Sequence, residues 1–370
     1  MTCAIACAQR GLAVSVHEAA RELAEVGAGL TLGRGAQHVF RALGIQAEVA
    51  AIACPAGALP FVHYRDGRLL FGARDGGDGT PDDGHADIVR HCYRADLQAV
   101  LVAAAARLGV PVQLGQTLVA VDQHDSGVTA RFADGGAVGG DVLVGADGVR
   151  SVVRASVAPG DAPRYTGHVA YRFLVPAPAA EPHMALGRSA IFIGPQRTFN
   201  RYTMAGGRVV NCAGLVETSE AVAEGWSIPA GRDELRAAFA GWHPDVIGLI
   251  GQADRCIKWG LYDRAPLDHW SQGRVTVLGD AAHAMLPFLG MGAAMAIEDG
   301  WVLARALAES GDPGTALARY QAERKPRCDQ VHAASLRQGQ MTQAMDPDRI
   351  DGSRVPMADE AMMGFDPVRG

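Results

Sequence analysis

Several features that would place this chain in a familiar class are missing from its sequence. Its 7 cysteines are scattered and include no C-x-x-C pair, which favours reduced thiols over a disulfide framework. The longest apolar run, Ala99–Ala106, is far too short to span a bilayer. Met1–Ala8 is apolar but lacks the basic start and the cleavage pattern of a signal peptide. We therefore expect a soluble protein of the cytoplasm, without a membrane partner.

An excess of positive charge is also missing. The chain carries 34 Lys and Arg against 40 Asp and Glu, a net charge of −6, so no nucleic-acid partner is expected. It has no cluster of zinc-ligand residues and no G-x-S-x-G motif, so we expect neither a metal site nor a side-chain nucleophile. What is present, 48% hydrophobic residues over 370 positions, is ample for a core in one large domain or in two interlocked domains.

The most informative stretch runs from Gly273 to Gly300. Arg274–Leu278 predicts a short buried strand, which Gly279 and Asp280 end. A linker, AAHAMLP, follows, and a helix rich in Ala and Met is expected to begin near Gly290–Gly292. Glycines there let a ligand approach the backbone, free N–H groups favour negative charge, and a carboxylate suits polyol hydroxyls. A flavin nucleotide has both an anionic edge and a polyol, although a plain strand–turn–helix explains the spacing equally well.

The N-terminal segment has the pattern of the back half of a nucleotide-binding βαβ unit. Met1–Arg10 predicts a helix, Gly11 its end, and Ala13–Val16 a strand. Glu18 then stands where an acidic residue holds ribose hydroxyls, although a lone Glu can also be a surface carboxylate. The front half, a strand followed by G-x-G-x-x-G, is absent from the sequence. We expect either that the stated start lies inside a longer reading frame, whose upstream part supplies the missing segment, or that the chain is a truncated copy whose remaining strands have free edges.

Two motifs carry a resemblance to a known family. The sequence G-D-A-A-H-x-x-x-P, followed by G-x-G and a helix containing Glu-Asp, resembles the second FAD-binding motif of the single-component FAD-dependent aromatic hydroxylases, the salicylate and p-hydroxybenzoate hydroxylase group. Earlier in the chain, Asp141–Arg154 resembles the same family's motif G-A-D-G-x-x-S-x-x-R. The resemblance implies a class A flavoprotein monooxygenase. Such an enzyme uses FAD, NADH or NADPH, and O₂ to hydroxylate a small phenolic or hydroxy-acid substrate through a flavin hydroperoxide.

The resemblance also implies cofactor-binding roles for single residues. Glu18 and Asp280 would hold FAD hydroxyls, and Arg94, in the segment YRADL, would contact the polar chain of the cofactor. A salt bridge at the start of a helix is the alternative interpretation of Arg94. Asp147 of the D-G motif would serve both FAD and NAD(P)H. The residues expected where the backbone runs close to the cofactor are Gly29, Gly279, Gly290, Met291 and Gly292.

Two further residues are expected in the catalytic part of the site. Pro287 would line the active site beside the flavin ring. Tyr202 lies in a strand on which relatives present a Tyr to the aromatic substrate, although a buried core Tyr is at least as plausible. The sequence departs from the family at Arg34 and Gly35, where the relatives usually carry Pro-Asn.

The resemblance implies an α/β fold, in which a Rossmann-like FAD-binding domain, truncated at its N-terminus, is interleaved with an α+β substrate domain of mainly antiparallel sheet. Alternating segments between Tyr165 and Asp263, and a hairpin signal at Asp66-Gly67, agree with such a sheet. The expected boundaries are 1–55, 88–158 and 270–335 for the FAD-binding domain, 56–87 and 159–269 for the substrate domain, and 336–370 for a C-terminal tail.

Two alternatives to aromatic hydroxylation stay open at this point. One is a different flavin chemistry on the same fold, as in an epoxidase or a reductase. The other is a truncated flavoprotein that folds but binds FAD poorly and has no activity. The sequence leaves open the choice between a monomer and a homodimer.

Overall fold

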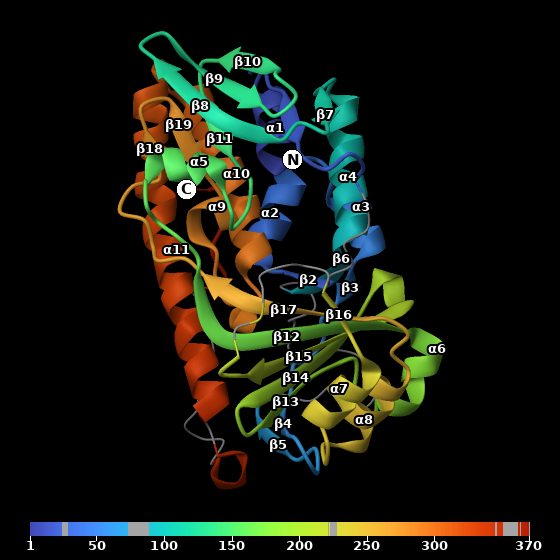
Figure 1. The fold of residues 1–370 in the computed structure, drawn as a ribbon. Coiled ribbons are helices and arrows are strands. Elements are labelled where there is room, and N and C mark those ends of the chain that lie inside the picture. Colours follow the sequence, from blue (N-terminus) through green and yellow to red (C-terminus); the bar gives the residue numbers. More distant parts are fainter. Residues whose placement is uncertain are drawn as a thin grey trace.

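A computed structural model of the protein describes residues 1–23, 29–72, 89–220, 222, 228–344, 346–350, 362 and 364–369. Much of the expected tail, including 351–361, lies outside the described residues. Figure 1 shows an upper part made of helices and small sheets, and a lower part built on one large sheet. Among the described helices, none combines the length and the apolar character that crossing a membrane requires.

The upper part contains most of the helices. They are α1 (Thr2–Gln9), α2 (Arg34–Ala42), α3 (Gln46–Ile52), α4 (Arg94–Arg107), α5 (Val152–Val157), α9 (Asp280–His283), the 3-10 turn η4 (Pro287–Leu289), α10 (Gly292–Glu309) and α11 (Pro313–Ala344). Helix α1 packs on α10 so closely at Gly300 that a Cβ there would come within 2.8 Å of the Cys3 backbone nitrogen. The two helices share a buried apolar core that also includes α2, α4 and β19.

The strands of the upper part form small separate sheets. The parallel pair β1–β7 joins β1 (Val16–Glu18) to β7 (Val112–Leu114), and β10 (Ala137–Gly140), β9 (Gly127–Phe132) and β8 (Leu118–His124) form an antiparallel sheet. A third sheet orders β11 (Leu143–Gly145), β19 (Val275–Val277) and β18 (Ser271–Gln272), and a fourth orders β2 (Gly29–Leu32), β6 (Arg90–Tyr93) and β3 (Cys54–Pro55).

The first strand lies later in the chain than the sequence predicts. The sequence predicts a strand over Ala13–Val16, but of these residues only Val16 belongs to a strand. The observed strand β1 covers Val16–Glu18, because the three-residue strand β7 pairs with these residues. On its other edge β1 has no partner among the described residues, and β11 is paired only with β19.

The lower part is one eight-stranded sheet with helices on its outer face (Figure 1). Its order is β16 (Ile228–Ala230), β17 (Cys256–Asp263), β12 (Arg164–Pro176), β15 (Val209–Glu217), β14 (Arg197–Met204), β13 (Ser189–Gly194), β4 (Phe61–His63) and β5 (Leu69–Phe71). All pairs are antiparallel except β13–β4, and β4–β5 is the predicted hairpin. The associated short elements are α6 (Ala177–Ala180), η2 (Glu181–His183), η3 (Ala205–Gly207), α7 (Arg232–Ala238) and α8 (Pro244–Gly251).

The two faces of the large sheet differ, because successive side chains of a strand point in opposite directions. One face carries Phe173, Phe199 and Cys212 into a core shared with α7 and α8. The other face is turned toward the upper part, where Asn211 of β15 accepts a hydrogen bond from the backbone N–H of Gly29 at 3.3 Å. The strands of this sheet come from segments 61–71 and 164–263, which lie inside the segments expected for the substrate domain.

Helix α11 runs along both parts of the molecule (Figure 1). It continues past position 336, where the sequence places the start of a tail, and ends at Ala344. Pro326 lies inside it and cannot donate a backbone hydrogen bond to the preceding turn. The short 3-10 turn η5 (Pro347–Arg349) follows, and Phe365 returns to lie under the guanidinium of Arg327, whose carbon is 4.2 Å from the ring centroid.

Candidate active site

The predicted Gly-Asp turn forms directly after β19. Gly279 adopts φ 59° and ψ −141°, and a Cβ there would lie 3.0 Å from the Cβ of Ala296 in α10. Its N–H donates to the Asp299 carboxylate at 3.0 Å. The segment predicted to be a linker instead begins with the one-turn helix α9. This helix forms because the N–H groups of Ala282 and His283 both donate hydrogen bonds to the Gly279 carbonyl. The turn is therefore held by glycine geometry on one side and by a buried carboxylate on the other.

Asp280 presents a free carboxylate beside the start of α10. It has no hydrogen-bond partner among the described residues, and a Cβ at Gly292 would lie 4.0 Å from its Oδ1 atom. The side chain is exposed, yet it sits in a recess where loss of solvation raises its pKa. The charges of His283 and Arg94 oppose that rise, so Arg94 faces the same recess. A carboxylate, a helix N-terminus and a cation meet there.

Arg94 is the first residue of α4 and is exposed. Within the described residues it has no ion pair, and the nearest acid on its own helix, Asp96, lies 4.0 Å from Arg208 instead. The alternative interpretation of Arg94 as a structural salt bridge therefore finds no partner in the described part of the chain. Its five N–H donors are available to a ligand in the recess.

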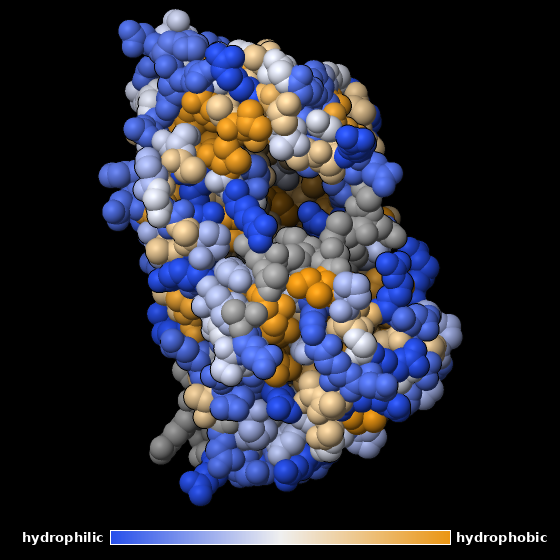
Figure 2. Space-filling model, in the orientation of Figure 1, coloured by the Kyte–Doolittle hydropathy of each residue, from blue (hydrophilic) through white to orange (hydrophobic). Residues whose placement is uncertain are grey.

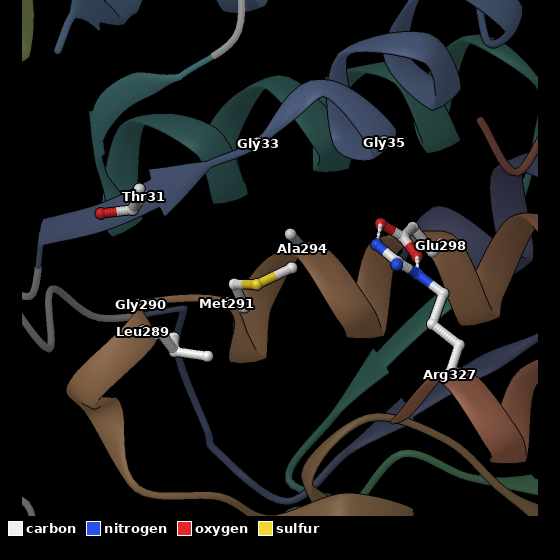
Figure 3. A pocket seen from close by; sticks show the side chains of 9 residues that line it. All are labelled: Thr31, Gly33, Gly35, Leu289, Gly290, Met291, Ala294, Glu298 and Arg327. Atoms are coloured by element: carbon white, nitrogen blue, oxygen red, sulfur yellow. Dashed lines mark hydrogen bonds and ion pairs between the residues drawn. The ribbon is translucent and has the colours of Figure 1, made fainter. Parts of the chain in front are cut away.

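A groove lies between β2 and the start of α10. Figure 3 shows Thr31 on the strand, facing Leu289 and Met291, while an ion pair between Glu298 and Arg327 closes the far end. Its lining residues are Thr31, Gly33, Gly35, Leu289, Gly290, Met291, Ala294, Glu298 and Arg327. Gly290 adopts φ 66°, and a Cβ there would come within 3.4 Å of Thr31, so the backbone of the two segments runs close together.

Gly35, one of the two positions at which the sequence departs from the family, lies against the Glu298 side chain at this groove. A Cβ at Gly35 would lie 2.2 Å from Oε1 of Glu298, so a larger residue would collide with that buried carboxylate. Pro287 opens η4 at the other end of the groove and is exposed.

Tyr202 lies on the face of the large sheet that is turned toward β2 and β6. Its ring stacks on His91, with centroids 4.0 Å apart, and a Cβ at Gly29 would lie 2.3 Å from its hydroxyl oxygen. Gly29 is thus needed for the approach of Tyr202, whatever it also provides to a cofactor. Burial raises the pKa of Tyr202 to about 12 and lowers that of His91 to about 3, so both rings are neutral at physiological pH.

Figure 2 shows a hollow in the middle of the molecule, between the upper and lower parts, with apolar side chains on its floor and hydrophilic side chains at its rim. The groove and the Tyr202 face are built from elements on the two sides of this boundary. Such a concave, largely apolar space with a few polar groups is typical of small-molecule sites.

Comparisons with known proteins identify this arrangement. The family described as an FAD binding domain matches residues 1–335. A 3-amino-4-hydroxybenzoate 2-monooxygenase of Streptomyces platensis is 36% identical over 340 residues, 92% of this chain and 85% of that protein. A 3-hydroxybenzoate 6-hydroxylase of Polaromonas naphthalenivorans is 33% identical and covers 95% and 87% of the two chains. The chain belongs to the FAD-dependent aromatic hydroxylase family.

The fold of this chain is similar to that of a solved FAD-bound protein. The structure of Klebsiella pneumoniae HpxO complexed with FAD and uric acid aligns with a TM-score of 0.81 and 25% identity over 94% of this chain and 87% of that one. The predicted cofactor, FAD, and the predicted fold of an FAD-binding part with an interleaved sheet are confirmed. The unpaired Asp280, the unpaired Arg94 and the start of α10 fit the polyol and the phosphates of FAD.

Glu18 and Asp147 are the two remaining residues predicted to bind the cofactor. Glu18 accepts a hydrogen bond from the N–H of Ala20 at 2.8 Å at the end of β1. Burial lowers the pKa of the Met1 amino group, and the nearby Glu18 carboxylate opposes that shift, so Glu18 lies close to the start of α1. One of its oxygens stays free for a ribose hydroxyl. Its role toward FAD stays a prediction.

Asp147 is occupied within the protein. Its carboxylate accepts hydrogen bonds from the Ser151 hydroxyl and from the N–H groups of Val152, at 2.7 Å, and Val153, at 3.1 Å. The D-G motif of this FAD-dependent hydroxylase thus caps α5, which is a sufficient local reason for an acid at this position. A direct contact of Asp147 with the cofactor stays a prediction.

Arg154 is the last residue of the D-G motif, and its role could not be predicted from the sequence. Its guanidinium is fully buried, donates to Asp161 at 2.6 Å, and reaches the carbonyl oxygens of Ala281 and Ala282 at 3.1 and 2.7 Å. It therefore positions α9, the turn that carries Asp280. The role of His91 was not predicted either, because its local sequence gives no indication that its ring stacks on Tyr202.

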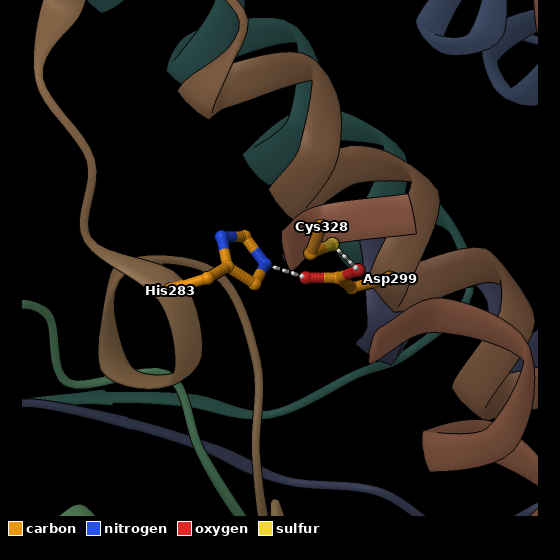
Figure 4. A group of neighbouring side chains, drawn as sticks. All are labelled: His283, Asp299 and Cys328. Carbon is orange, nitrogen blue, oxygen red and sulfur yellow. Dashed lines mark hydrogen bonds and ion pairs between the residues drawn. The ribbon is translucent and has the colours of Figure 1, made fainter. Parts of the chain in front are cut away.

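A buried cluster of His283, Asp299 and Cys328 lies behind the recess (Figure 4). His283 Nε2 and Asp299 Oδ2 are 2.6 Å apart, and the Cys328 thiol donates to the other carboxylate oxygen at 3.8 Å. Although these residue types can bind metals, Arg324 already pairs with Asp299 at 2.8 Å. We therefore interpret the cluster as a buried ion-pair network that holds Asp299 under the Gly279 turn.

The site predicts a specific effect of Asp280→Ala on FAD binding. A hydrogen bond from a hydroxyl to a charged acceptor contributes about 1.5–3 kcal/mol, so the Kd for FAD should rise about tenfold or more. Because the Asp280 side chain is exposed and unpaired, the unfolding transition should not move. Fluorescence titration of the apoprotein with FAD measures the first quantity. Asp122→Ala, which removes an exposed carboxylate far from the recess, is the control; equal FAD affinities for the two variants would remove Asp280 from the site.

Proposed function

We propose that this protein is a monooxygenase that uses NAD(P)H and O₂ to hydroxylate a small aromatic acid. The observation that carries the proposal is the placement of Tyr202. It lies on the sheet face opposite the FAD-binding elements, with its hydroxyl free of any hydrogen bond among the described residues. The relatives named above act on 3-amino-4-hydroxybenzoate and 3-hydroxybenzoate, which are both phenolic carboxylic acids. We also propose the division into an FAD-binding domain, a substrate domain and a tail that the sequence suggests.

The protein's own residues would bind and orient the substrate and exclude water. FAD, when bound, supplies the redox and oxygen chemistry. An apolar cluster of Ala170, Leu215, Trp259 and Leu286 joins the large sheet to the segment before η4, and provides a dry wall for a ring. Pro287 follows Leu286 directly and would line the same space. The neutral hydroxyl of Tyr202 would hydrogen bond to the phenol of the substrate and fix which ring carbon is presented.

The proposal is tested by measuring NADH and NADPH oxidation with a panel of hydroxylated aromatic acids. We expect at least one acid to accelerate oxidation and to yield a product that carries one atom from ¹⁸O₂. A reductase on the same fold would incorporate no ¹⁸O, and an epoxidase would place the oxygen across a double bond. Purified protein without flavin absorbance, or with flavin but without response to any aromatic compound, would contradict the proposal.

Replacing Tyr202 by Phe should impair hydroxylation and leave FAD content unchanged. The loss of one hydrogen bond to the phenol should reduce kcat/KM about tenfold, while the ring keeps its stacking on His91. Tyr165→Phe, which removes a hydroxyl bound to the Glu220 carbonyl at the rim of the same sheet, is the matched control. If Tyr202→Phe turns over like Tyr165→Phe, Tyr202 is a core residue and has no role in substrate binding.

A further inference from the structure

Arg172 and Asn200 share a row on the inner face of the large sheet, the face turned toward the FAD-binding elements. Arg172 of β12 is the direct partner of Ala213 in β15, and Ala213 is the direct partner of Asn200 in β14. The two polar side chains thus stand on either side of one small residue. Asn200 is two residues before Tyr202 on the same strand, and therefore on the same face.

Both polar side chains contain a buried atom without a hydrogen bond among the described residues. These atoms are Nε of Arg172 and Oδ1 of Asn200. Buried polar atoms in folded proteins are almost always hydrogen bonded, and an exception calls for a specific reason. A single ligand lying across Ala213 would supply hydrogen-bond partners to both unpaired atoms.

Arg172 is half-buried, and it differs from the fully buried arginines of this chain in lacking an acidic partner among the described residues. Arg154 pairs with Asp161 at 2.6 Å, Arg324 with Asp299 at 2.8 Å, and Arg201 lies 3.8 Å from Asp245. Arg172 has no acidic partner in the described part of the chain, and its guanidinium carbon lies 5.0 Å from the ring centroid of Trp259. Loss of solvation lowers the pKa of Arg172. Tyr202 acts in the opposite direction, and the positive charge of Arg94 lowers the pKa of Arg172 further. A half-buried cation with a buried Nε atom, no acidic partner among the described residues and a second cation nearby is stabilised by an anion.

We propose that Arg172 binds the carboxylate of the aromatic substrate, whose ring lies over Ala213 and whose opposite end meets the amide of Asn200. This inference rests on the proposed function and names the group that selects the substrate. A guanidinium matches a carboxylate through two parallel N–H···O bonds, which a lysine cannot form. The apolar cluster around Trp259 and Leu215 adjoins the same row, since Ala170, two residues before Arg172 in β12, pairs with Trp259. The row therefore offers a charged end, an apolar floor and a neutral polar end.

The test uses the FAD-loaded protein, the most active acid of the panel and the carboxamide of the same acid. Binding is measured at equilibrium by the change in flavin absorbance, and turnover by product formation. For Arg172→Met we expect the Kd of the acid to rise about 10- to 100-fold, as for the loss of a bidentate charge-assisted pair, and that of the carboxamide to change about twofold at most. Arg172→Lys should recover part of the acid binding. FAD content should stay as in the wild type.

Two further variants sharpen the test. Arg208→Met removes an exposed arginine at the start of β15 and should leave both Kd values unchanged. Ala213→Leu fills the floor of the row and should weaken the acid and the carboxamide alike, because the ring itself is then displaced. Asn200→Leu should raise KM for acids with a ring hydroxyl or amino group more than for the unsubstituted acid.

The outcomes separate this inference from the proposed function. If the wild type hydroxylates acids while Arg172→Met binds acid and carboxamide as the wild type does, the carboxylate is held elsewhere and this inference fails alone. If Arg172→Met loses FAD, Arg172 belongs to the cofactor site and the inference fails. A wild type that hydroxylates neutral phenols as readily as acids overturns it as well. A wild type without response to any aromatic compound overturns the proposed function, and this inference with it.

Discussion

Replacing Arg324 by Ala should lower the free energy of unfolding by about 3–5 kcal/mol, the usual cost of removing one partner from a buried ion pair. Arg324 is fully buried, its Nε donates to Asp299 at 2.8 Å, and its Nη1 lies 2.8 Å from Glu298 Oε2. The variant leaves the fully buried Asp299 carboxylate with His283, the Cys328 thiol and the N–H of Gly279 as its remaining partners, and without its arginine. Denaturation in guanidinium chloride measures the loss.

The same helix offers a matched control for Arg324. Arg319 pairs with Glu309 at 2.8 Å, but both side chains are about half exposed, so Arg319→Ala should cost about 1 kcal/mol or less. Equal unfolding midpoints for the two variants would show that the buried network contributes no stability. In that case Asp299 would have to be neutral in the folded protein.

Lowering the pH should destabilise the protein through the same buried network. Burial works to raise the pKa of Asp299, but His283 and Arg324 lower it to about 2. Because this value lies below the ordinary 3.8, the Asp299 carboxylate contributes stability above pH 3.8 that is lost as the pH falls toward 2. In Arg324→Ala the folded-state pKa of Asp299 should rise, so acid unfolding should begin at a higher pH than in the wild type.

Substituting Arg154 by Met should weaken both the fold and FAD binding, with a loss of about 3 kcal/mol in unfolding free energy and about a tenfold rise in the Kd for FAD. The variant removes the pairing with Asp161 and leaves the buried carbonyl groups of Ala265, Ala281 and Ala282 without their donor. Two of those carbonyls belong to α9, so the Asp280 carboxylate should lose its fixed position.

The combination of readouts distinguishes a positioning role of Arg154 from a direct one. Arg154→Lys keeps the charge but cannot reach several acceptors at once, and it should fall between the wild type and Arg154→Met in both measurements. A loss of FAD affinity without any change in unfolding would instead indicate a direct contact with the cofactor. Arg131→Met, at an exposed pair with Asp122, controls for the change of surface charge.

The parts of the site that could be predicted from the sequence are those fixed by local geometry. Gly279 and Asp280 were recognised because a strand, a glycine with positive φ and a helix start follow one another within a few residues. The hairpin at Asp66-Gly67 and the start of α10 at Gly292 are predictable for the same reason. Alternation along β14 likewise places Asn200 and Tyr202 on one face, although it does not say which face is turned toward the cofactor.

The parts that could not be predicted depend on contacts between distant segments. Arg154 contacts α9 across more than a hundred positions of the sequence. The interest of Arg172 depends on its lacking an acidic partner among the described residues, which come from several distant segments. At Asp147 the family motif predicts a cofactor contact, and the structure adds a second role that the motif did not indicate, since the carboxylate also accepts hydrogen bonds at the start of α5. At Gly29 the sequence predicts a close approach to a cofactor, which stays a prediction, and it did not predict that the Tyr202 ring also lies against this glycine.

Helix α11 has a mechanical consequence for the site. Near the middle of the helix, Arg324 and Cys328 donate hydrogen bonds to Asp299, the residue that binds the N–H of Gly279. About three turns further on, at ~1.5 Å per residue, Ser335 donates to the Leu286 carbonyl and Gly339 packs against Phe288, beside the wall of the proposed substrate space. A continuous helix cannot shorten between these two anchor points. A movement of the sheet relative to the cofactor elements must therefore bend the helix between Cys328 and Ser335 or break one of these contacts.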